Sequence, residues 1–305
     1  KVRDAVARLG YVRDTYAANL ARQRQYSFVF LLPERSSQFA DTLTGALREA
    51  VASQRAERVT IRIRHAPMHD PHAIVRALRA LKTARLDGVA IMAPETPQVR
   101  DAVARLKEAG LAVVSLATDL PNAPRDYFIG INNIVAGRTA ASLMGRFVGG
   151  GGRVLVATHS LRSRDSLERR LGFDEVMARD FPGATVSPTV ESYDDPARME
   201  AIVETVLAAC PRLAGVYSMG SGNPALLSAL RRSGRLRETA VIAHELTPTT
   251  RQALLDDEID AVIAQNAGHL ARSALRVLRG VCDGQPIYDA QERIRTEIIL
   301  RENLP

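Results

Sequence analysis

Short apolar runs alternate with amphipathic stretches from Tyr26 onward. The apolar runs, which predict buried strands, lie at 27–32, 59–63, 88–92 and 111–116. The stretches between them predict helices at 38–55, 71–84 and 97–109. Strands that are apolar on both faces and separated by helices are typical of a parallel sheet covered on both sides. The sequence therefore predicts a doubly wound α/β lobe.

The same alternation begins again after 119–127, a polar segment with two prolines that predicts a loop crossing out of the first lobe. Further strands are predicted at 153–157, 185–190, 213–218, 240–243, 259–264 and 292–300. Further helices are predicted at 133–148, 166–180, 196–208, 224–233, 249–257 and 266–281. Two similar lobes joined by crossing segments place a ligand in the cleft between them, beyond the carboxyl ends of their strands.

Composition agrees with this α/β class. The chain has 305 residues, 46% of them hydrophobic and 25% charged, with no Trp. No run reaches the roughly 18 to 20 apolar residues that span a bilayer, and the start does not resemble a signal peptide. With Cys210 and Cys282 as its only thiols, the chain predicts no disulfide framework, and we expect a cytoplasmic protein without a membrane partner.

Charge is concentrated at the start of the chain. Residues 1–25 contain six basic and two acidic residues, so they carry +4 of the net charge of +7, and all remaining residues supply +3. A basic end on a nearly balanced body indicates that the end, rather than the body, meets a polyanion.

The motifs of enzymes and cofactor sites do not occur in the sequence. The glycines at 149–152 lack a following Lys-Ser or Lys-Thr and precede a strand, so they predict a turn. His65, His69, His72 and Asp70 lie in a loop with two prolines, which disfavours a metal site. Adjacent strand residues point to opposite faces, so we expect no acid–base couple from His244 and Glu245. The sequence predicts no enzyme, cofactor or metal.

Three polar residues lie where the cleft is predicted. Arg169, in the first helix of the second lobe, can donate a fork of hydrogen bonds to paired hydroxyls. Glu245 follows a strand and can accept from vicinal hydroxyls, and Gln265, after the next strand, can do both. This combination suits a small sugar or polyol.

The chain resembles the lactose-repressor (LacI/GalR) family of bacterial transcription regulators over nearly its whole length. "KVRDAVARLGYV" (1–12) looks like the last helix of that family's helix-turn-helix domain, and "RDTYAANLARQRQ" (13–25) looks like its hinge helix. Leu9 and Gly10 suit a helix and its end, and Asp14 suits the N-cap of a second helix too short to persist alone in water.

The resemblance implies a body with the type I periplasmic-binding fold and ligand contacts within it. Arg169 matches the arginine of an R-x-x-G-F motif, Glu245 stands where Asp is usual, and Gln265 matches a residue at a crossing. Three other strands are followed by matched residues. These are Asn223 with Ser221 at the rim, Thr118 and Asp119 in place of an aspartate that falls on Ala117, and Phe39 within 35–39. The implied lobes are 26–129 with 266–285, and 130–265 with 286–305.

The resemblance also implies a homodimer that binds operator DNA, with Leu20 wedged into the minor groove. The other hinge residues expected at the DNA are Tyr16, Ala17, Asn19 and Arg22. Because a complete helix-turn-helix is not present, we expect roughly 45 residues of DNA-binding head upstream of Lys1. A rival hypothesis is a periplasmic sugar-binding protein of an ABC transporter, whose fold is nearly identical.

Overall fold

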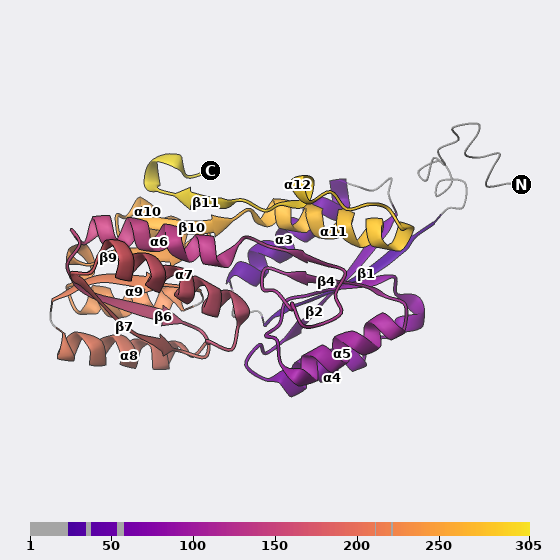
Figure 1. The fold of residues 1–305 in the computed structure, drawn as a ribbon, viewed down its shortest axis with the longest axis horizontal. Helices are drawn as coiled ribbons and strands as arrows, with labels where there is room; N and C mark the ends of the chain where they lie inside the picture. The colour runs from indigo at the N-terminus through magenta and orange to yellow at the C-terminus, as the bar shows by residue number, and fades with distance from the viewer. Residues whose placement is uncertain (1–23, 35–37, 54–57, 211, 221) are drawn as a thin grey trace, which may run out of the picture.

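The computed structural model describes residues 24–305 except 35–37, 54–57, 211 and 221, and it consists of two α/β lobes side by side (Figure 1). The five described strands of the first sheet have the order β2-β1-β3-β4-β5 and are all parallel. They are β1 (Tyr26–Pro33), β2 (Val59–Ala66), β3 (Gly88–Ile91), β4 (Ala112–Leu116) and β5 (Tyr127–Ile129). The helices on this sheet are α3 (Gln38–Ser53), α4 (Pro71–Arg79), α5 (Pro97–Glu108) and α11 (Ala267–Asp283).

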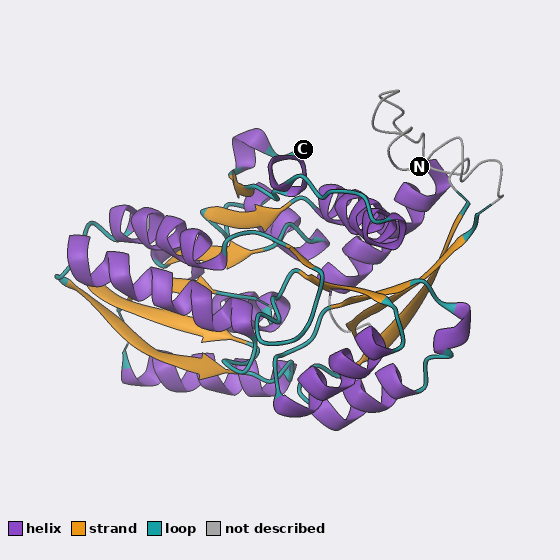
Figure 2. Cartoon of the chain, turned by 45° about the vertical axis from the view of Figure 1, so that its right-hand side comes forward, coloured by secondary structure: helices purple, strands orange, loops and turns teal. Residues whose placement is uncertain are grey.

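The described strands of the second sheet have the order β11-β10-β9-β8-β6-β7, and among them only the edge strand β11 is antiparallel. Its strands are β6 (Gly152–Thr158), β7 (Ala184–Glu191), β8 (Leu213–Ser218), β9 (Ala240–His244), β10 (Ala261–Gln265) and β11 (Thr296–Ile299). Its helices are α6 (Asn133–Phe147), α7 (Arg164–Asp180), α8 (Pro196–Ala209), α9 (Asn223–Arg232) and α10 (Pro248–Leu255). Figure 2 shows helices on both sides of each sheet, which is the predicted doubly wound arrangement.

Alternate residues of each strand supply two separate apolar layers. In β1, Phe28, Phe30 and Leu32 pack with α3 and α11, whereas Val29 and Leu31 pack with α4 and α5. Successive strand side chains point to opposite faces, so a strand covered on both sides must be apolar throughout. This is why the strands were recognisable in the sequence as continuous apolar runs.

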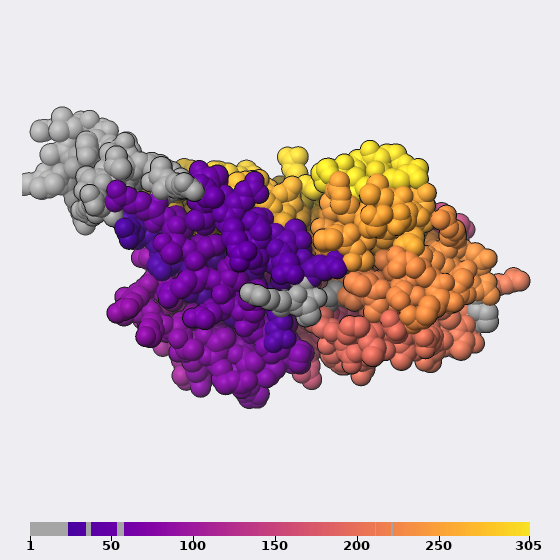
Figure 3. Space-filling model, turned by 180° about the vertical axis from the view of Figure 1, so that it is seen from behind, coloured from indigo at the N-terminus to yellow at the C-terminus, as the bar shows by residue number. Residues whose placement is uncertain are grey.

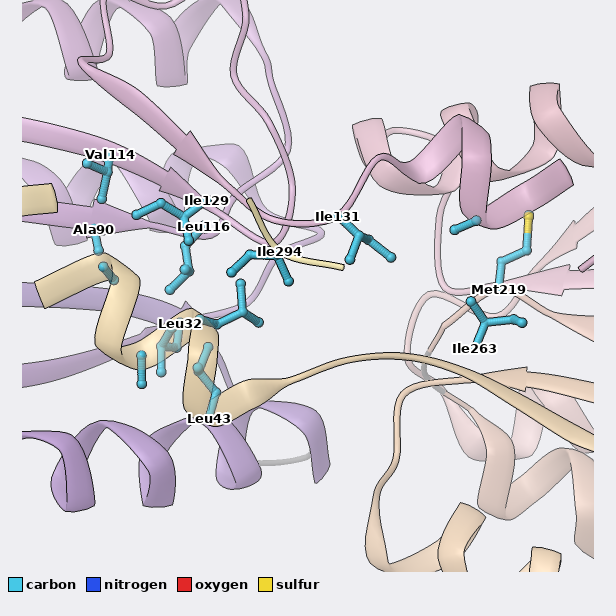
Figure 4. Packing of buried hydrophobic residues seen from close by; sticks show 14 of the residues in the cluster. Leu32, Leu43, Ala90, Val114, Leu116, Ile129, Ile131, Met219, Ile263 and Ile294 are labelled. Carbon is cyan, nitrogen blue, oxygen red and sulfur yellow. The ribbon is translucent and has the colours of Figure 1, made fainter. Parts of the chain in front are cut away.

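One apolar cluster continues across the crossing segments. Figure 4 shows Ile131 and Ile294 on these segments, with Leu32 on the first-lobe side and Met219 and Ile263 on the second-lobe side. The chain passes between the lobes after β5, after β10 and after the short helix α12 (Asp289–Glu292). The two lobes therefore share one apolar core where the chain crosses between them.

Helices α6 and α7 pack closely because each has a glycine at the contact. A Cβ added to Gly137 would lie 2.0 Å from the carbonyl oxygen of Arg169, and one added to Gly172 would lie 2.1 Å from that of Ile134. The backbones thus touch near the start of α6 and along the first half of α7, where a larger residue would force them apart. This contact fixes the height of Arg169 along the edge of the cleft.

One short strand was not predicted, and the last strand was predicted too long. The loop predicted at 119–127 is present up to Asp126 and leads into the unpredicted β5, a strand of three residues that pairs with β4. The strand predicted at 292–300 begins only at Thr296, because Glu292 belongs to α12 and is held against α11 by Ser273 and Arg276 (Nε to Oε1 2.8 Å). Residues near 289–292 therefore pack on the first lobe, although the sequence assigned 286–305 to the second.

The turn predicted at 149–152 is present, with Gly149, Gly150 and Gly152 at positive φ. Cys210 and Cys282 are free thiols. None of the described helices combines the length and apolar character that crossing a membrane demands. Residues 1–23, with the predicted DNA contacts Tyr16, Ala17, Asn19, Leu20 and Arg22, lie outside the described residues.

Candidate functional site

A cavity of about 150 Å³ lies between the lobes at the carboxyl ends of their strands. The first lobe contributes Phe39, Met68 and Met92, and the second contributes polar side chains from α7, β9 and β10. In Figure 3 the indigo and purple surface of the first lobe meets the orange surface of the second. Here Gln38 and Thr249 exchange two hydrogen bonds of 2.8 and 3.2 Å, so the lobes are joined across the cleft.

Arg169 is the main cation of the site and is only 3% exposed. Its Nε donates to Asn133 Oδ1 at 2.9 Å, and its Nη1 donates to the carbonyl oxygen of Met219 at 2.6 Å. Its guanidinium also lies 3.7 Å from Asp165 Oδ2 and 3.5 Å from Glu245 Oε1. The side chain is therefore held rigidly, with Nη2 on the side of Glu245, where it can donate to a ligand hydroxyl.

Glu245 adopts a backbone conformation that is uncommon for a residue with a side chain. It follows β9 with φ of 68°, and its N–H donates to the carbonyl oxygen of Ile263. Ala117 occupies the corresponding position after β4, with φ of 61° and an N–H bond to Ile129. The left-handed region costs roughly 1–2 kcal/mol for most residues, and short polar side chains tolerate it best. Both lobes thus turn sharply as their strands enter the cavity.

The turn at Glu245 corrects an expectation from the sequence. His244 and Glu245 were expected on opposite faces, yet both line the cavity, because the left-handed residue breaks the alternation of the strand. Burial raises the pKa of Glu245, and Arg169 offsets part of that rise. Gln265 Nε2 donates to Glu245 Oε1 at 2.8 Å and so fixes one carboxylate oxygen.

His244 is a neutral imidazole that pairs with a buried tyrosine. Burial, together with the charge of Arg169, lowers its pKa well below 6.5. Its Nε2 lies 2.8 Å from the hydroxyl of Tyr217, whose ring stacks on Phe173 at 4.5 Å between centroids. Burial also raises the pKa of Tyr217, which therefore remains a phenol. The pair presents an uncharged polar group to the cavity.

Asp165 stays ionised although it is buried. Burial opposes ionisation, but Arg169, His159 and hydrogen bonds from Ser163 and Thr118 outweigh it and lower the pKa of Asp165. The side chain forms an i, i+4 pair with Arg169 on α7.

Four buried polar atoms near the cavity have no hydrogen-bond partner among the described residues. They are Asn133 Nδ2, His244 Nδ1, Glu245 Oε2 and Gln265 Oε1. An unsatisfied buried polar atom costs about 1–3 kcal/mol, so such groups are rarely left without a use. Three of them belong to residues that line the cavity, His244, Glu245 and Gln265, and form a set of polar groups suited to a ligand with several hydroxyls.

The structure brings five of the eight predicted ligand contacts to the cavity: Arg169, Glu245, Gln265, Asn223 and Phe39. Asp119 and Thr118 do not line it. Asp119 is engaged by Arg125 (Nη2 to Oδ2 2.7 Å), and Thr118 accepts from the backbone of Asp165 at 3.4 Å. Ser221 lies outside the described residues.

Sequence reasoning did not single out several polar residues that line the cavity: His159, Asp165, Asp194, His244 and Thr247. Gln38, which also lines it, lies within the range 35–39 where first-lobe contacts were expected. The i, i+4 spacing of Asp165 and Arg169 was a signal that could have identified one of them. Thr247 was recognisable as an N-cap before Pro248, and its side chain and that of Thr250 form a capping box.

The histidine-rich loop of the first lobe has a structural role. Asp70 caps α4 by accepting from the N–H groups of His72 and Ala73, and His65 Nδ1 lies 2.7 Å from the carbonyl oxygen of Pro33. Among the described residues, no group of three or more His, Cys, Asp or Glu side chains is arranged to hold a metal ion.

Comparison with protein families identifies the fold. The family described as "Periplasmic binding protein domain" matches residues 28–286. The chain belongs to the periplasmic binding protein family. Within it, the two parallel-sheet lobes are those of a type I member. A sequence comparison with curated proteins finds no match.

Solved structures of this periplasmic binding protein fold resemble the chain closely. An ABC transporter solute-binding protein from Burkholderia graminis, in complex with D-arabinose, has a TM-score of 0.83 and 26% identity over 92% of this chain and 96% of the relative. GanP, a glucose-galactose binding protein from Geobacillus stearothermophilus, has a TM-score of 0.82 and 18% identity over 92% and 99%. A putative LacI transcriptional regulator from Bacteroides fragilis has a TM-score of 0.80 and 17% identity over 92% and 98%.

Proposed function

We propose that this protein is a sugar-responsive, DNA-binding transcription regulator whose effector, a small sugar or polyol, binds between the lobes. The observation that carries the effector part is the cluster of unpartnered buried polar atoms on the cavity, next to Arg169 and beside apolar Phe39. Sugars need many directional hydrogen bonds together with an apolar surface for their C–H faces. The arrangement binds and orients, and we propose no catalysis.

Relatives with bound ligands support a sugar as effector. The Burkholderia graminis protein holds D-arabinose, and a solute-binding protein from Agrobacterium vitis holds α-D-tagatopyranose. In this chain, Oε2 of Glu245 has no partner among the described residues and Nη2 of Arg169 lies 3.5 Å from Oε1 of the same carboxylate, so we assign the two groups to adjacent hydroxyls of such a ligand.

The basic segment before β1 supports DNA as the second partner. Residues 1–25 resemble the last head helix and hinge helix of LacI-type regulators, and the Bacteroides fragilis relative is a putative member of that family. Arg24, two residues before the strand, pairs with Asp283 at 3.1 Å, at the end of α11. A head attached there is tied to the first lobe and can respond when the second lobe moves.

In this proposal the protein acts in the cytoplasm as a homodimer on operator DNA, with Leu20, Ala17, Tyr16, Asn19 and Arg22 in or near the minor groove. A ligand changes DNA affinity only if it binds one arrangement of the lobes better than the other. The Gln38–Thr249 contact closes the cleft, so a ligand that fills the cavity favours the closed arrangement.

A periplasmic sugar-binding protein of an ABC transporter is the second candidate. Most of the similar solved structures named in the comparison are solute-binding proteins of this kind, and their fold is shared with regulators. The two candidates differ in what precedes β1, because a transporter component has no use for a DNA-binding head.

Two experiments separate these candidates. A thermal-shift screen of pentoses, hexoses and polyols on the purified chain identifies the effector, and Arg169→Ala and Glu245→Ala should abolish the rise in melting temperature. Fluorescence anisotropy of the complete natural protein on DNA from upstream of its own gene then tests the regulator. Specific binding that changes with the identified sugar supports it, and sugar binding without any DNA binding leaves the transporter component.

A further inference from the structure

The charge of the cavity lining restricts the ligand beyond the general class of sugars. The described residues that line the cavity include three carboxylates, on Asp165, Asp194 and Glu245, and one guanidinium, that of Arg169. His244 is neutral because burial lowers its pKa well below 6.5. The described lining is therefore net negative when these carboxyl groups are ionised.

The guanidinium is not free to receive an anion. Arg169 already donates to Asn133 and Met219, and it lies within 3.7 Å of both the Asp165 and the Glu245 carboxylates. An anionic ligand would have to compete with two buried carboxylates for one cation. In a partly desolvated site, the two carboxylates repel an anionic group that is placed beside them.

The helix N-terminus next to Arg169 does not make the cavity more favourable for an anionic ligand. The start of α7, which would favour an anion through its unpaired N–H groups, already carries Asp165 in its first turn. The unpartnered oxygens Glu245 Oε2 and Gln265 Oε1, both buried, require hydrogen-bond donors from a ligand. Hydroxyl and ammonium groups donate, whereas carboxylates and phosphate dianions only accept.

We propose that the cavity selects polyhydroxylated ligands that carry no negative charge, either neutral sugars and polyols or amino sugars, and rejects sugar acids and sugar phosphates. The proposal rests on the proposed function, because it names the ligand class of that same cavity. Glu245 and Asp165 act as the charge filter, and Arg169 holds them in place.

Isothermal titration of the purified chain with sets of related sugars that differ in charge tests the charge filter. One set consists of D-galactose, D-galacturonate, D-galacturonamide and D-galactosamine, and the other of D-arabinose and D-arabinose 5-phosphate. The uronate and its amide differ mainly in charge. We expect the uronate and the phosphate to bind at least about tenfold more weakly than the amide and the parent sugar. D-Galactosamine should bind at least as tightly as D-galactose.

Isosteric variants locate the effect. Glu245→Gln should narrow the difference between D-galacturonate and D-galacturonamide, and Asp165→Asn provides a second variant if the first does not fold. Glu175→Gln, an exposed carboxylate on the same helix as Asp165, should leave the difference unchanged. An anionic member that binds as tightly as its neutral counterpart overturns the charge filter but leaves sugar binding standing. No binding by any neutral sugar of the panel or of the thermal-shift screen overturns the proposed function, and the filter with it.

Discussion

Replacing Arg169 with Met should destabilise the protein strongly as well as remove ligand binding. The guanidinium is 3% exposed, makes hydrogen bonds of 2.9 and 2.6 Å, and lies 3.5 and 3.7 Å from two buried carboxylates. Methionine fills part of the volume but leaves both carboxylates without a cation. Removing one partner of a buried ion pair costs about 3–5 kcal/mol in free energy of unfolding, and we expect a loss of this size at pH 7.

The loss should depend on pH and on Glu245. Burial already raises the pKa of Glu245, so this carboxyl group can be protonated at acidic pH, and the difference between Arg169→Met and wild type should shrink as pH falls. Adding Glu245→Gln should recover part of the stability at pH 7 without restoring ligand binding. Urea unfolding followed by circular dichroism measures both effects. If the free energy of unfolding of Arg169→Met alone lies within about 1 kcal/mol of wild type at pH 7, Arg169 does not compensate the buried carboxylates.

Three further outcomes are expected. Folding lowers the pKa of His244, so as pH falls below 6.5 the unfolded chain binds a proton at this residue before the folded protein does. The free energy of unfolding should therefore fall by up to about 1.4 kcal/mol per pH unit from this group. A His244→Gln variant whose stability depends on pH as that of wild type does would contradict this. Gly137→Ala should lose about 1–3 kcal/mol of stability and weaken sugar binding, because the added Cβ meets the carbonyl oxygen of Arg169. The control Gly45→Ala, whose Cβ would have no atom within 4 Å, should instead gain about 0.5–1 kcal/mol, and urea unfolding measures both changes. Gln38→Ala removes both hydrogen bonds to Thr249 between the lobes. Small-angle scattering should then show a larger radius of gyration, and calorimetry should show sugar binding that is up to about tenfold weaker. A radius of gyration equal to that of wild type would contradict this.

Much of the fold could be predicted from the sequence because burial on two faces leaves a continuous apolar pattern. The strand predicted at 27–32 is β1, and the helix predicted at 97–109 is α5, which ends one residue earlier. The short strand β5 was missed because three residues after a proline-rich loop carry too little pattern to recognise. The last strand was predicted too long, because the apolar alternation near 292–300 does not reveal that Glu292 is held by α11.

The cavity was less predictable than the fold. Arg169, Glu245 and Gln265 were expected there since each stands beside the end of a strand or at the start of a helix, and all three line the cavity. The presence of His244 depends on the φ angle of its neighbour, which periodicity does not specify. Asp119 was misplaced because its ion pair with Arg125 is a contact within the loop between β4 and β5 of the first lobe, which the residue pattern does not reveal.

The most direct test of the central claim is a calorimetric comparison of wild type and Glu245→Ala with the sugar that most raises the melting temperature of the chain. The account predicts one site per chain in wild type and a dissociation constant at least about tenfold higher in the variant, because a hydrogen bond to a carboxylate is worth about 1.5–3 kcal/mol. Equal dissociation constants for the two proteins, with the variant folded, would show that the sugar binds somewhere other than the cavity between the lobes.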